Sequence, residues 1–314
     1  MSIQCPTCLT ENTDDAINCI ACGTALANTI NSSAYHLPSG TLLKQGAYQI
    51  EKLLGEGGFG ITYKGIYLQN SAEVAIKELW PEKAARIGTT VTWPFSITPS
   101  ERQHQIQKFQ LEASCQYQCV HPNIAIIYDW FEENGTAYIV MEFISGQSLY
   151  QILKNEGILD ENRVKSYFIK IAEALKVIHD QNLLHRDIKP DNILIDEQDR
   201  AVLIDFGATK EFIAGQTREM TRILTDGYAP LEQYSLRGKR FPAIDIYALC
   251  ASMYELLTGK LPAAATDIAN APETLIPPRK LSSNLSPLIE RVILTGMQLK
   301  AEDRIQSADE LIAA

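Results

Sequence analysis

The sequence predicts an α+β fold in which a β-rich part precedes a mainly helical part, with a small cysteine-rich segment in front. Three observations support this prediction. Residues 48–65 place β-favouring apolar residues on both sides of a glycine-rich turn, and a further apolar strand ends at Lys77. Apolar residues then recur at helical steps of three and four at Val164, Phe168, Ile171, Leu175 and Ile178. Four of the seven cysteines lie within the first 22 residues.

The composition sets limits on the class of protein. The chain has 314 residues, of which 46% are hydrophobic and 21% charged, and its net charge is −10. An acidic balance argues against a general nucleic-acid binder, which usually presents a basic face. No apolar run approaches the roughly 18 residues that span a bilayer. The start MSIQCPTC lacks the features of a signal peptide, so we expect a cytoplasmic protein without a membrane segment or a nucleic-acid partner.

The first cysteines form two Cys-x-x-Cys turns, CPTC and CIAC. Two such turns can present four thiolates to one ion, which is the pattern of a structural Zn²⁺ site. We therefore expect a zinc-ribbon-like segment over residues 1–27, with Cys5, Cys8, Cys19 and Cys22 as ligands. A single iron, a redox disulfide pair and unliganded thiols are the alternatives. Residues 28–46 have no hydrophobic period and contain Asn, Ser, Gly and Pro, which predicts a linker.

The glycine-rich turn contains Gly55, Gly57, Gly58 and Gly60, and the sequence VAIK follows it. Glycine lets backbone N–H groups approach closely, so a strand–turn–strand of this kind can fold over phosphates. The same glycine spacing could open a dinucleotide-binding unit, but that unit needs a helix directly after the glycines. Here ITYKGIY follows, which favours a strand.

A dense polar motif, HRDIKPDN, occupies residues 185–192 directly after the predicted helix. Two short apolar strands then lead to Asp205-Phe206-Gly207. With these separated motifs in order, the chain resembles the eukaryotic-like (Hanks-type) serine/threonine protein kinases of bacteria, and cyanobacterial members in particular. The resemblance covers the chain from about Tyr48 to its end.

The resemblance implies a bilobal protein-kinase fold over residues 47–314, with a β-rich small lobe (47–141) and a mainly helical large lobe (145–314). It implies transfer of the γ-phosphate of ATP to serine and threonine hydroxyls of protein substrates, including autophosphorylation in the activation loop. Lys189, two residues after Asp187, marks the serine/threonine class, and Thr225 is expected to bond both residues.

Residue roles follow from the same resemblance. Asp187, Lys189 and Asn192 are the expected catalytic residues, and Asn192 and Asp205 would hold Mg²⁺ or Mn²⁺. Lys77 would hold the ATP phosphates while paired with Glu112, and backbone groups of Glu142 and Ile144 would meet the adenine. The expected nucleotide-binding residues are Gly55, Gly57, Gly60, Thr62, Ala75, Lys77, Glu112, Glu142, Ile144, Asn192, Leu194 and Asp205.

Regulation is expected in the segment from Asp205 to Glu232. Thr221 is the predicted activating phosphorylation site and Thr217 the second candidate. A phosphate orders a loop when cations await it, and the expected cations are Arg186, Lys210 and Lys108. Alternatively, Arg186 only packs and Thr221 is a solvated residue.

Smaller features complete the prediction. Glu232 is expected to pair with Arg304 in a buried ion pair. The helix that carries Glu112 is predicted to begin with Ser100 as N-cap and Gln103 as its capping-box partner. Gln116 stands where the family has an apolar residue, and we expect it to loosen that helix. The long segment WPEKAARIGTTVTWPFS before the helix has no readable role.

An active protein kinase is the preferred interpretation. A pseudokinase is the main alternative, although every expected catalytic residue type is present. A small-molecule phosphotransferase of related fold and a zinc-binding regulatory scaffold are the others.

Overall fold

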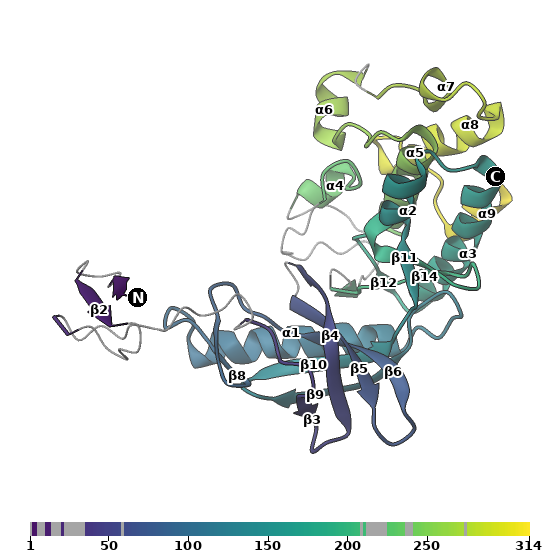
Figure 1. Cartoon of the computed structure of the whole chain (residues 1–314). Coiled ribbons are helices and arrows are strands. Elements are labelled where there is room, and N and C mark those ends of the chain that lie inside the picture. Colours follow the sequence, from purple (N-terminus) through teal and green to yellow (C-terminus); the bar gives the residue numbers. More distant parts are fainter. Residues whose placement is uncertain are drawn as a thin grey trace.

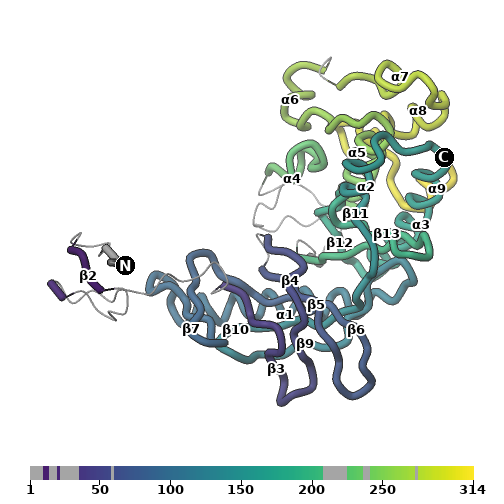
Figure 2. The backbone as a smooth tube through the Cα atoms, in the orientation of Figure 1, coloured from purple at the N-terminus to yellow at the C-terminus, as the bar shows by residue number. Residues whose placement is uncertain are grey.

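The computed structural model shows a β-rich lobe with one long helix, and beside it a second lobe made mainly of helices (Figure 1). The backbone passes from the first lobe to the second after residue 142 (Figure 2). The structure describes residues 2–4, 10–13, 20–21, 35–57, 60–207, 210–211, 225–235, 241–272 and 275–314. Among these residues, no helix combines the length and apolar character needed to cross a membrane.

The small lobe is built on a six-stranded antiparallel sheet in the order β3-β4-β5-β6-β10-β9. Its strands are β3 (Leu42–Leu43), β4 (Tyr48–Gly57), β5 (Gly60–Tyr67), β6 (Ala72–Glu78), β9 (Ile127–Glu133) and β10 (Thr136–Glu142). The predicted strand–turn–strand around the glycines is β4 and β5, and VAIK lies in β6. Side chains alternate between the two faces of a strand, so Lys77 and Glu78 point to opposite faces of the sheet.

One face of the sheet is covered by α1 (Pro99–Tyr117), which packs on β9 and β10 through Ile106, Phe109 and Ala113. The predicted cap of this helix was wrong by two residues: Thr98 is the N-cap and Glu101 completes the capping box. Proline at the first helical position favours this arrangement, because it excludes its predecessor from helical geometry and needs no N–H donor there.

The opposite face of the sheet is covered by segments that precede and follow its central strands. Leu37 and Leu43 are buried there with Tyr63, Ile76 and residues of neighbouring strands. The later part of the expected linker, residues 35–46, therefore packs on the small lobe and contributes β3. The long segment before α1 adds a small hairpin of β7 (Ala85–Ile87) and β8 (Thr90–Thr92).

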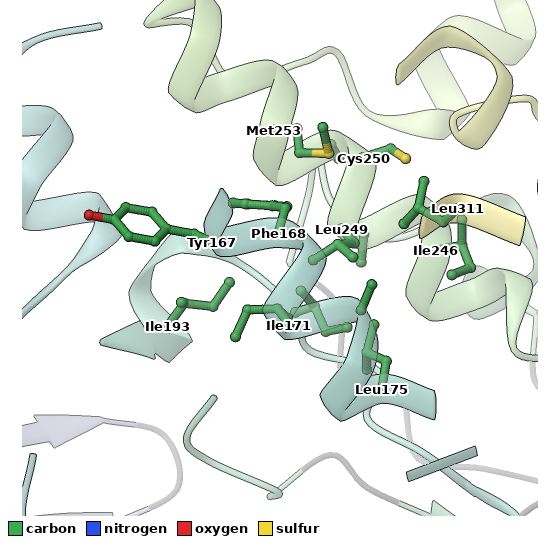
Figure 3. Packing of buried hydrophobic residues seen from close by; sticks show 14 of the residues in the cluster. Tyr167, Phe168, Ile171, Leu175, Ile193, Ile246, Leu249, Cys250, Met253 and Leu311 are labelled. Atoms are coloured by element: carbon green, nitrogen blue, oxygen red, sulfur yellow. The ribbon is translucent and has the colours of Figure 1, made fainter. Parts of the chain in front are cut away.

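The large lobe surrounds α5 (Ala243–Thr258), of which every residue is buried. Gly259 ends α5 with φ 69°, in the left-handed region that glycine adopts readily. The predicted amphipathic helix is α3 (Glu161–Asp180), and Figure 3 shows its Phe168, Ile171 and Leu175 packed near Leu249 of α5. The other helices are α2 (Leu149–Glu156), α4 (Leu231–Tyr234), α6 (Ala265–Asn270), α7 (Pro278–Leu281), α8 (Pro287–Gly296) and α9 (Ala308–Ala313).

Short strands and 3₁₀ turns connect the helices of the large lobe and bring the polar motifs together. A three-stranded sheet contains β11 (Gly146–Ser148), β13 (Ile193–Asp196) and β14 (Ala201–Leu203), and β12 (Leu183–Leu184) pairs with β15 (Lys210–Glu211). The 3₁₀ turns are η2 (Pro190–Asn192) and η4 (Ala301–Asp303). Near the N-terminus, β1 (Ser2–Gln4) pairs with β2 (Glu11–Thr13).

Candidate functional site

The motif HRDIKPDN forms a loop between β12 and η2 whose polar side chains converge on Asp187. Lys189 Nζ donates to both carboxylate oxygens of Asp187, at 3.1 and 2.9 Å. The Thr225 hydroxyl donates to Asp187 Oδ1 at 2.9 Å and accepts from Lys189 Nζ at 3.3 Å. Asn192 Nδ2 donates to the backbone carbonyl and to Oδ2 of Asp187, at 2.8 and 3.0 Å. The structure thus brings Asp187, Lys189, Asn192 and Thr225 into one hydrogen-bonded cluster.

The loop is held from below by Asp245, a fully buried carboxylate in the first turn of α5. It accepts backbone N–H groups of His185 and Arg186 at 3.0 and 2.7 Å, and His179 Nε2 lies 2.8 Å away. Burial opposes ionisation of Asp245, but these histidine and amide contacts outweigh it and hold its pKa below the ordinary value. The charged carboxylate therefore fixes the backbone next to Asp187.

The backbone of this region adopts conformations that residues other than glycine rarely take. Arg186 has φ 68° and Asp205 has φ 64°, both in the left-handed region. Such residues persist where surrounding contacts determine them, often at functional sites. The Asp245 contacts supply this support at Arg186, together with Gln233, whose Nε2 donates to the Arg186 carbonyl at 3.0 Å.

The histidine of the motif has a packing role. His185 is buried, and its ring meets Phe206 edge to face with 5.0 Å between centroids. Burial lowers the pKa of His185, so the ring is neutral at pH 7.

A second cluster joins the two lobes at Lys77. Its Nζ lies 2.6 Å from Glu112 Oε1 on α1 and 2.7 Å from Asp205 Oδ1 of the large lobe. Burial disfavours the ammonium, but the two carboxylates outweigh it and raise the pKa of Lys77. Against its own burial, Asp205 has a lowered pKa because Lys77 lies beside it. The ion pair with Glu112 is the one that the sequence predicts, and the contact with Asp205 is an addition.

The glycine-rich strands lie next to the strand that carries Lys77, because β4 pairs with β5 and β5 pairs with β6. Gly60 has φ 132°, and a Cβ there would lie 2.1 Å from the carbonyl oxygen of Glu78, so only glycine fits. Added Cβ atoms at Gly55 and Gly57 would meet nothing within 4 Å, which leaves this backbone open to approach. Thr62 of β5 lies beside Lys77 in the sheet, and Ala75 of β6 lies beside Met141 of β10.

The connection between the lobes follows β10. Ile144 is buried in a small apolar cluster with Ala125 and Val202, and Leu194 packs against this cluster. Glu142 is fixed from both ends, since its N–H donates to the Ile126 carbonyl at 2.8 Å and its carboxylate lies 2.7 Å from Arg200 Nη2. Glu142 and Ile144, whose backbone groups are expected to meet the adenine, therefore lie on one firmly anchored segment.

Asn192 and Asp205 provide a donor set that fits Mg²⁺. The amide nitrogen of Asn192 is used in two hydrogen bonds to Asp187, which leaves its oxygen as the remaining acceptor. The backbone carbonyl of Asn192 accepts the N–H of Ile204, the residue before Asp205, so Asn192 and Asp205 lie close together. Oxygen ligands of this kind suit Mg²⁺, which usually takes one or two carboxylates plus phosphates and water.

The predicted regulatory residues are only partly within the described chain. Lys108 is exposed on α1 and lines a groove with Glu112 and Gly207. The Arg186 side chain is buried, and the backbone of Lys210 pairs with Leu184 directly before the Asp187 loop. Thr217 and Thr221 lie outside the described residues, as do Cys5, Cys8, Cys19 and Cys22. Within the described ranges, no group of three or more His, Cys, Asp or Glu residues could hold a metal ion.

The expectation that Gln116 loosens α1 is not supported. Gln116 is buried, α1 continues through Tyr117, and Gln116 Nε2 donates to the Ala125 carbonyl at 2.7 Å. A satisfied amide ties the helix to the chain that enters β9.

Sequence reasoning missed the support functions of Asp245 and Gln233. Asp245 offered a signal, because a carboxylate in the first turn of a mainly apolar helix needs buried donors. Gln233 offered none, because its partner Arg186 is distant in sequence.

Comparison with known proteins identifies the family to which this chain belongs. The family model described as "Protein kinase domain" matches residues 48–305. A Clostridium acetobutylicum protein named "Probable serine/threonine-protein kinase" is 30% identical over 284 residues, which is 87% of this chain and 40% of that protein. Serine/threonine-protein kinase PknA of Nostoc sp. is 30% identical over 85% of this chain and 46% of its own length.

A third relative is serine/threonine-protein kinase B of Synechocystis sp., which is 31% identical over 87% of this chain and 47% of its own length. The chain thus spans less than half the length of these three relatives.

Proposed function

Because this chain belongs to the protein kinase family, we propose that it transfers the γ-phosphate of ATP to serine and threonine hydroxyls of proteins. The observation that carries the proposal is the cluster around Asp187, where Lys189, Thr225 and Asn192 all bond one carboxylate. Phosphoryl transfer depends on positioning and charge neutralisation more than on covalent chemistry, and this cluster serves both.

Each residue of the cluster has a part in the transfer. Asp187 orients the attacking hydroxyl and accepts its proton as the phosphate leaves ATP. Lys189 places a positive charge beside the transferred group, and Thr225 fixes the geometry of both. Asn192 and Asp205 are the residues that would hold Mg²⁺, which when bound neutralises phosphate charge.

The small lobe positions the nucleotide. Lys77, held by Glu112, binds the α and β phosphates, and the glycine backbone at Gly55, Gly57 and Gly60 covers them. The adenine is bound near the connection between the lobes, by Thr62, Ala75, Glu142, Ile144 and Leu194. Lys77 also contacts Asp205, so the phosphate-binding lysine and the carboxylate that would hold Mg²⁺ lie side by side.

Incubation of the protein with ATP and Mg²⁺, followed by mass spectrometry of its peptides and of a generic protein substrate, tests this proposal. We expect phosphate on serine and threonine residues only. A protein that binds nucleotide but adds phosphate to nothing would favour the pseudokinase alternative.

We further propose that autophosphorylation at Thr221 activates the kinase, with Thr217 as the second candidate. Pairing of β15 with β12 supports this, because it brings the Lys210 backbone across from Leu184, two residues before Arg186. Phosphate at Thr221 would be neutralised by Arg186, Lys210 and Lys108, which would join the loop to α1. Activity of Thr221→Ala and Thr217→Ala after preincubation with ATP distinguishes the sites. Full activation of Thr221→Ala would exclude Thr221.

We also propose that Cys5, Cys8, Cys19 and Cys22 bind one structural Zn²⁺ in a segment over residues 1–27. The pairing of β1 with β2 supports this, because the first Cys-x-x-Cys lies between these two strands in the sequence. Elemental analysis of protein purified under reducing conditions should find one zinc per chain, and a Cys5→Ser, Cys8→Ser variant should bind none stably. Absence of zinc from the parent protein after incubation with Zn²⁺ would contradict the assignment.

A further inference from the structure

A buried carboxylate lies on the far side of the strand that carries Lys77. Glu78 has no exposed surface, and it accepts hydrogen bonds from Tyr63 Oη at 2.9 Å and from Tyr138 Oη at 2.9 Å. Arg86 Nη2 completes the set at 2.5 Å, from a side chain that is 2% exposed. A buried charge needs a partner and further donors, and Glu78 has both.

Arg86 comes from the β7–β8 hairpin, within the long segment whose sequence gave no sign of its role. Its guanidinium lies 4.9 Å from the ring centroid of Trp80, and Nη1 donates to the Thr89 carbonyl at 3.0 Å. Its Nε donates to the carbonyl of Tyr35 at 3.0 Å. Arg86 therefore links the hairpin, the strand of Lys77 and the chain that precedes the small lobe.

The preceding chain, residues 35–37, forms a strap on the sheet. The Tyr35 ring meets Trp80 edge to face, and the Leu37 N–H donates to Tyr63 Oη at 3.1 Å. Between them, His36 Nε2 lies 3.0 Å from Glu56 Oε1 in the glycine-rich β4. The strap thus contacts β4 and β5, which flank the glycine-rich turn, and is linked to Glu78 of β6 through Tyr63 and Arg86.

We propose that Glu78 and Arg86 are positioning residues of the nucleotide site, which tie the strap at residues 35–37 to the strand that carries Lys77. Side chains anchored on both faces of β6, Lys77 to Glu112 on one and Glu78 to Arg86 on the other, prevent the strand from shifting or rotating. Release of the strap frees the second anchor and lets Lys77 and the glycine-rich turn move away from the phosphates. The chain before residue 35 is thereby connected to nucleotide affinity.

Two tyrosines provide a matched pair of variants. Each phenol donates to one oxygen of Glu78 and accepts one N–H: Tyr63 from Leu37 of the strap, and Tyr138 from Asn134 in the turn between β9 and β10. Tyr63→Phe and Tyr138→Phe remove the same group from the same carboxylate, but only the former removes a hydrogen bond to the strap. Each removes hydrogen bonds worth about 1 kcal/mol, which the folded chain tolerates.

The affinity for Mg²⁺ with a non-hydrolysable ATP analogue is measured by calorimetry on the full chain, together with kcat and KM for ATP. We expect Arg86→Met to raise Kd and KM about tenfold, the effect of about 1.4 kcal/mol, with kcat changed less than about twofold. Tyr63→Phe should raise Kd about threefold, and Tyr138→Phe less than about twofold. Loss of a merely structural contact would lower the unfolding midpoint and the active fraction but would not change Kd.

Unchanged nucleotide affinity in Arg86→Met, or equal effects of the two phenylalanine variants, would overturn the proposal. If Arg86→Met does not fold, the two phenylalanine variants decide alone. The inference rests on the proposed kinase function, but the binding measurement needs no turnover. A parent protein that binds nucleotide without transferring phosphate would therefore refute the kinase function and leave the strap test intact.

Discussion

Replacement of Arg304 by methionine should destabilise the large lobe strongly. The Arg304 side chain is fully buried and Glu232 is 15% exposed, and the pair is bidentate with Nη1–Oε1 at 2.6 Å and Nη2–Oε2 at 2.9 Å. Arg304 also donates to the carbonyls of Gln298, Ala243 and Leu299. One side chain thus connects α4, α5 and the segment after α8. The ion pair between Glu232 and Arg304 is the one that the sequence analysis predicts.

The expected loss follows from these contacts. Removal of one partner of a buried ion pair costs about 3–5 kcal/mol, because the remaining charge has no counterion. Methionine fills much of the arginine volume, so the cavity is small, but the three carbonyls lose their donor. We expect Arg304→Met to lower the free energy of unfolding by about 4 kcal/mol. Glu232→Gln keeps the shape and part of the hydrogen bonding, so about 2 kcal/mol is expected.

Urea unfolding followed by circular dichroism measures both changes, with the exposed pair variant Lys170→Met as control. Lys170 lies 3.0 Å from Glu173 on the surface of α3, so its loss should cost less than about 0.5 kcal/mol. Arg304→Met should also lose transferase activity before it unfolds, because Gln233, next to Glu232, holds the Arg186 carbonyl. An Arg304→Met protein within about 1 kcal/mol of the parent would show that the pair does not anchor α4.

Three further outcomes follow from buried groups. Gln116→Leu should lower stability by about 1–2 kcal/mol, measured by urea unfolding, because the Ala125 carbonyl loses its donor; a stabilised variant would contradict this. Burial acts to raise the pKa of Asp245, but the contacts with His179 and the backbone amides lower it by more, so the pKa in the folded protein is below the ordinary value. The ionised carboxylate therefore stabilises the fold above about pH 4, the pKa in the unfolded chain. This stabilisation is lost as pH falls through the lower pKa of the folded protein. Asp245→Asn should therefore be less stable than the parent at pH 7 and approach it below pH 4, and a difference that does not shrink in acid would count against this. Burial raises the pKa of Cys250 to about 12 and of Cys119 to about 11, so neither should react with a thiol reagent at pH 8 until the protein unfolds, as mass spectrometry of labelled peptides can check.

The sequence predicted the parts of this molecule that are encoded locally. Glycine spacing, strand-forming residues and the periodicity of α3 identified the elements, and the polar motifs identified the residues that meet at Asp187 and Lys77. The pairing of Glu112 with Lys77, across 35 positions, came from the family resemblance and is present in the structure.

Features that depend on contacts made only in the folded chain escaped prediction. The role of Arg86 exists only because Glu78, Trp80 and Tyr35 surround it in the folded chain. Gln116 was expected to weaken α1 as an isolated buried amide, but the Ala125 carbonyl satisfies it. The cap of α1 is predictable in principle, because Thr98 stands directly before a proline, but Ser100 and Gln103 repeat the capping-box spacing two residues later.

The rate of phosphate transfer by an Asp187→Asn variant is the most direct test of the proposed mechanism. Asparagine has almost the same shape and keeps one acceptor for Thr225, so the fold and nucleotide affinity should match the parent. Without a carboxylate to orient the hydroxyl and accept its proton, transfer to protein substrate should fall by about 10²–10⁴-fold. A folded Asp187→Asn protein that phosphorylates its substrate at a rate near the parent's would contradict the assignment of Asp187 as the catalytic base.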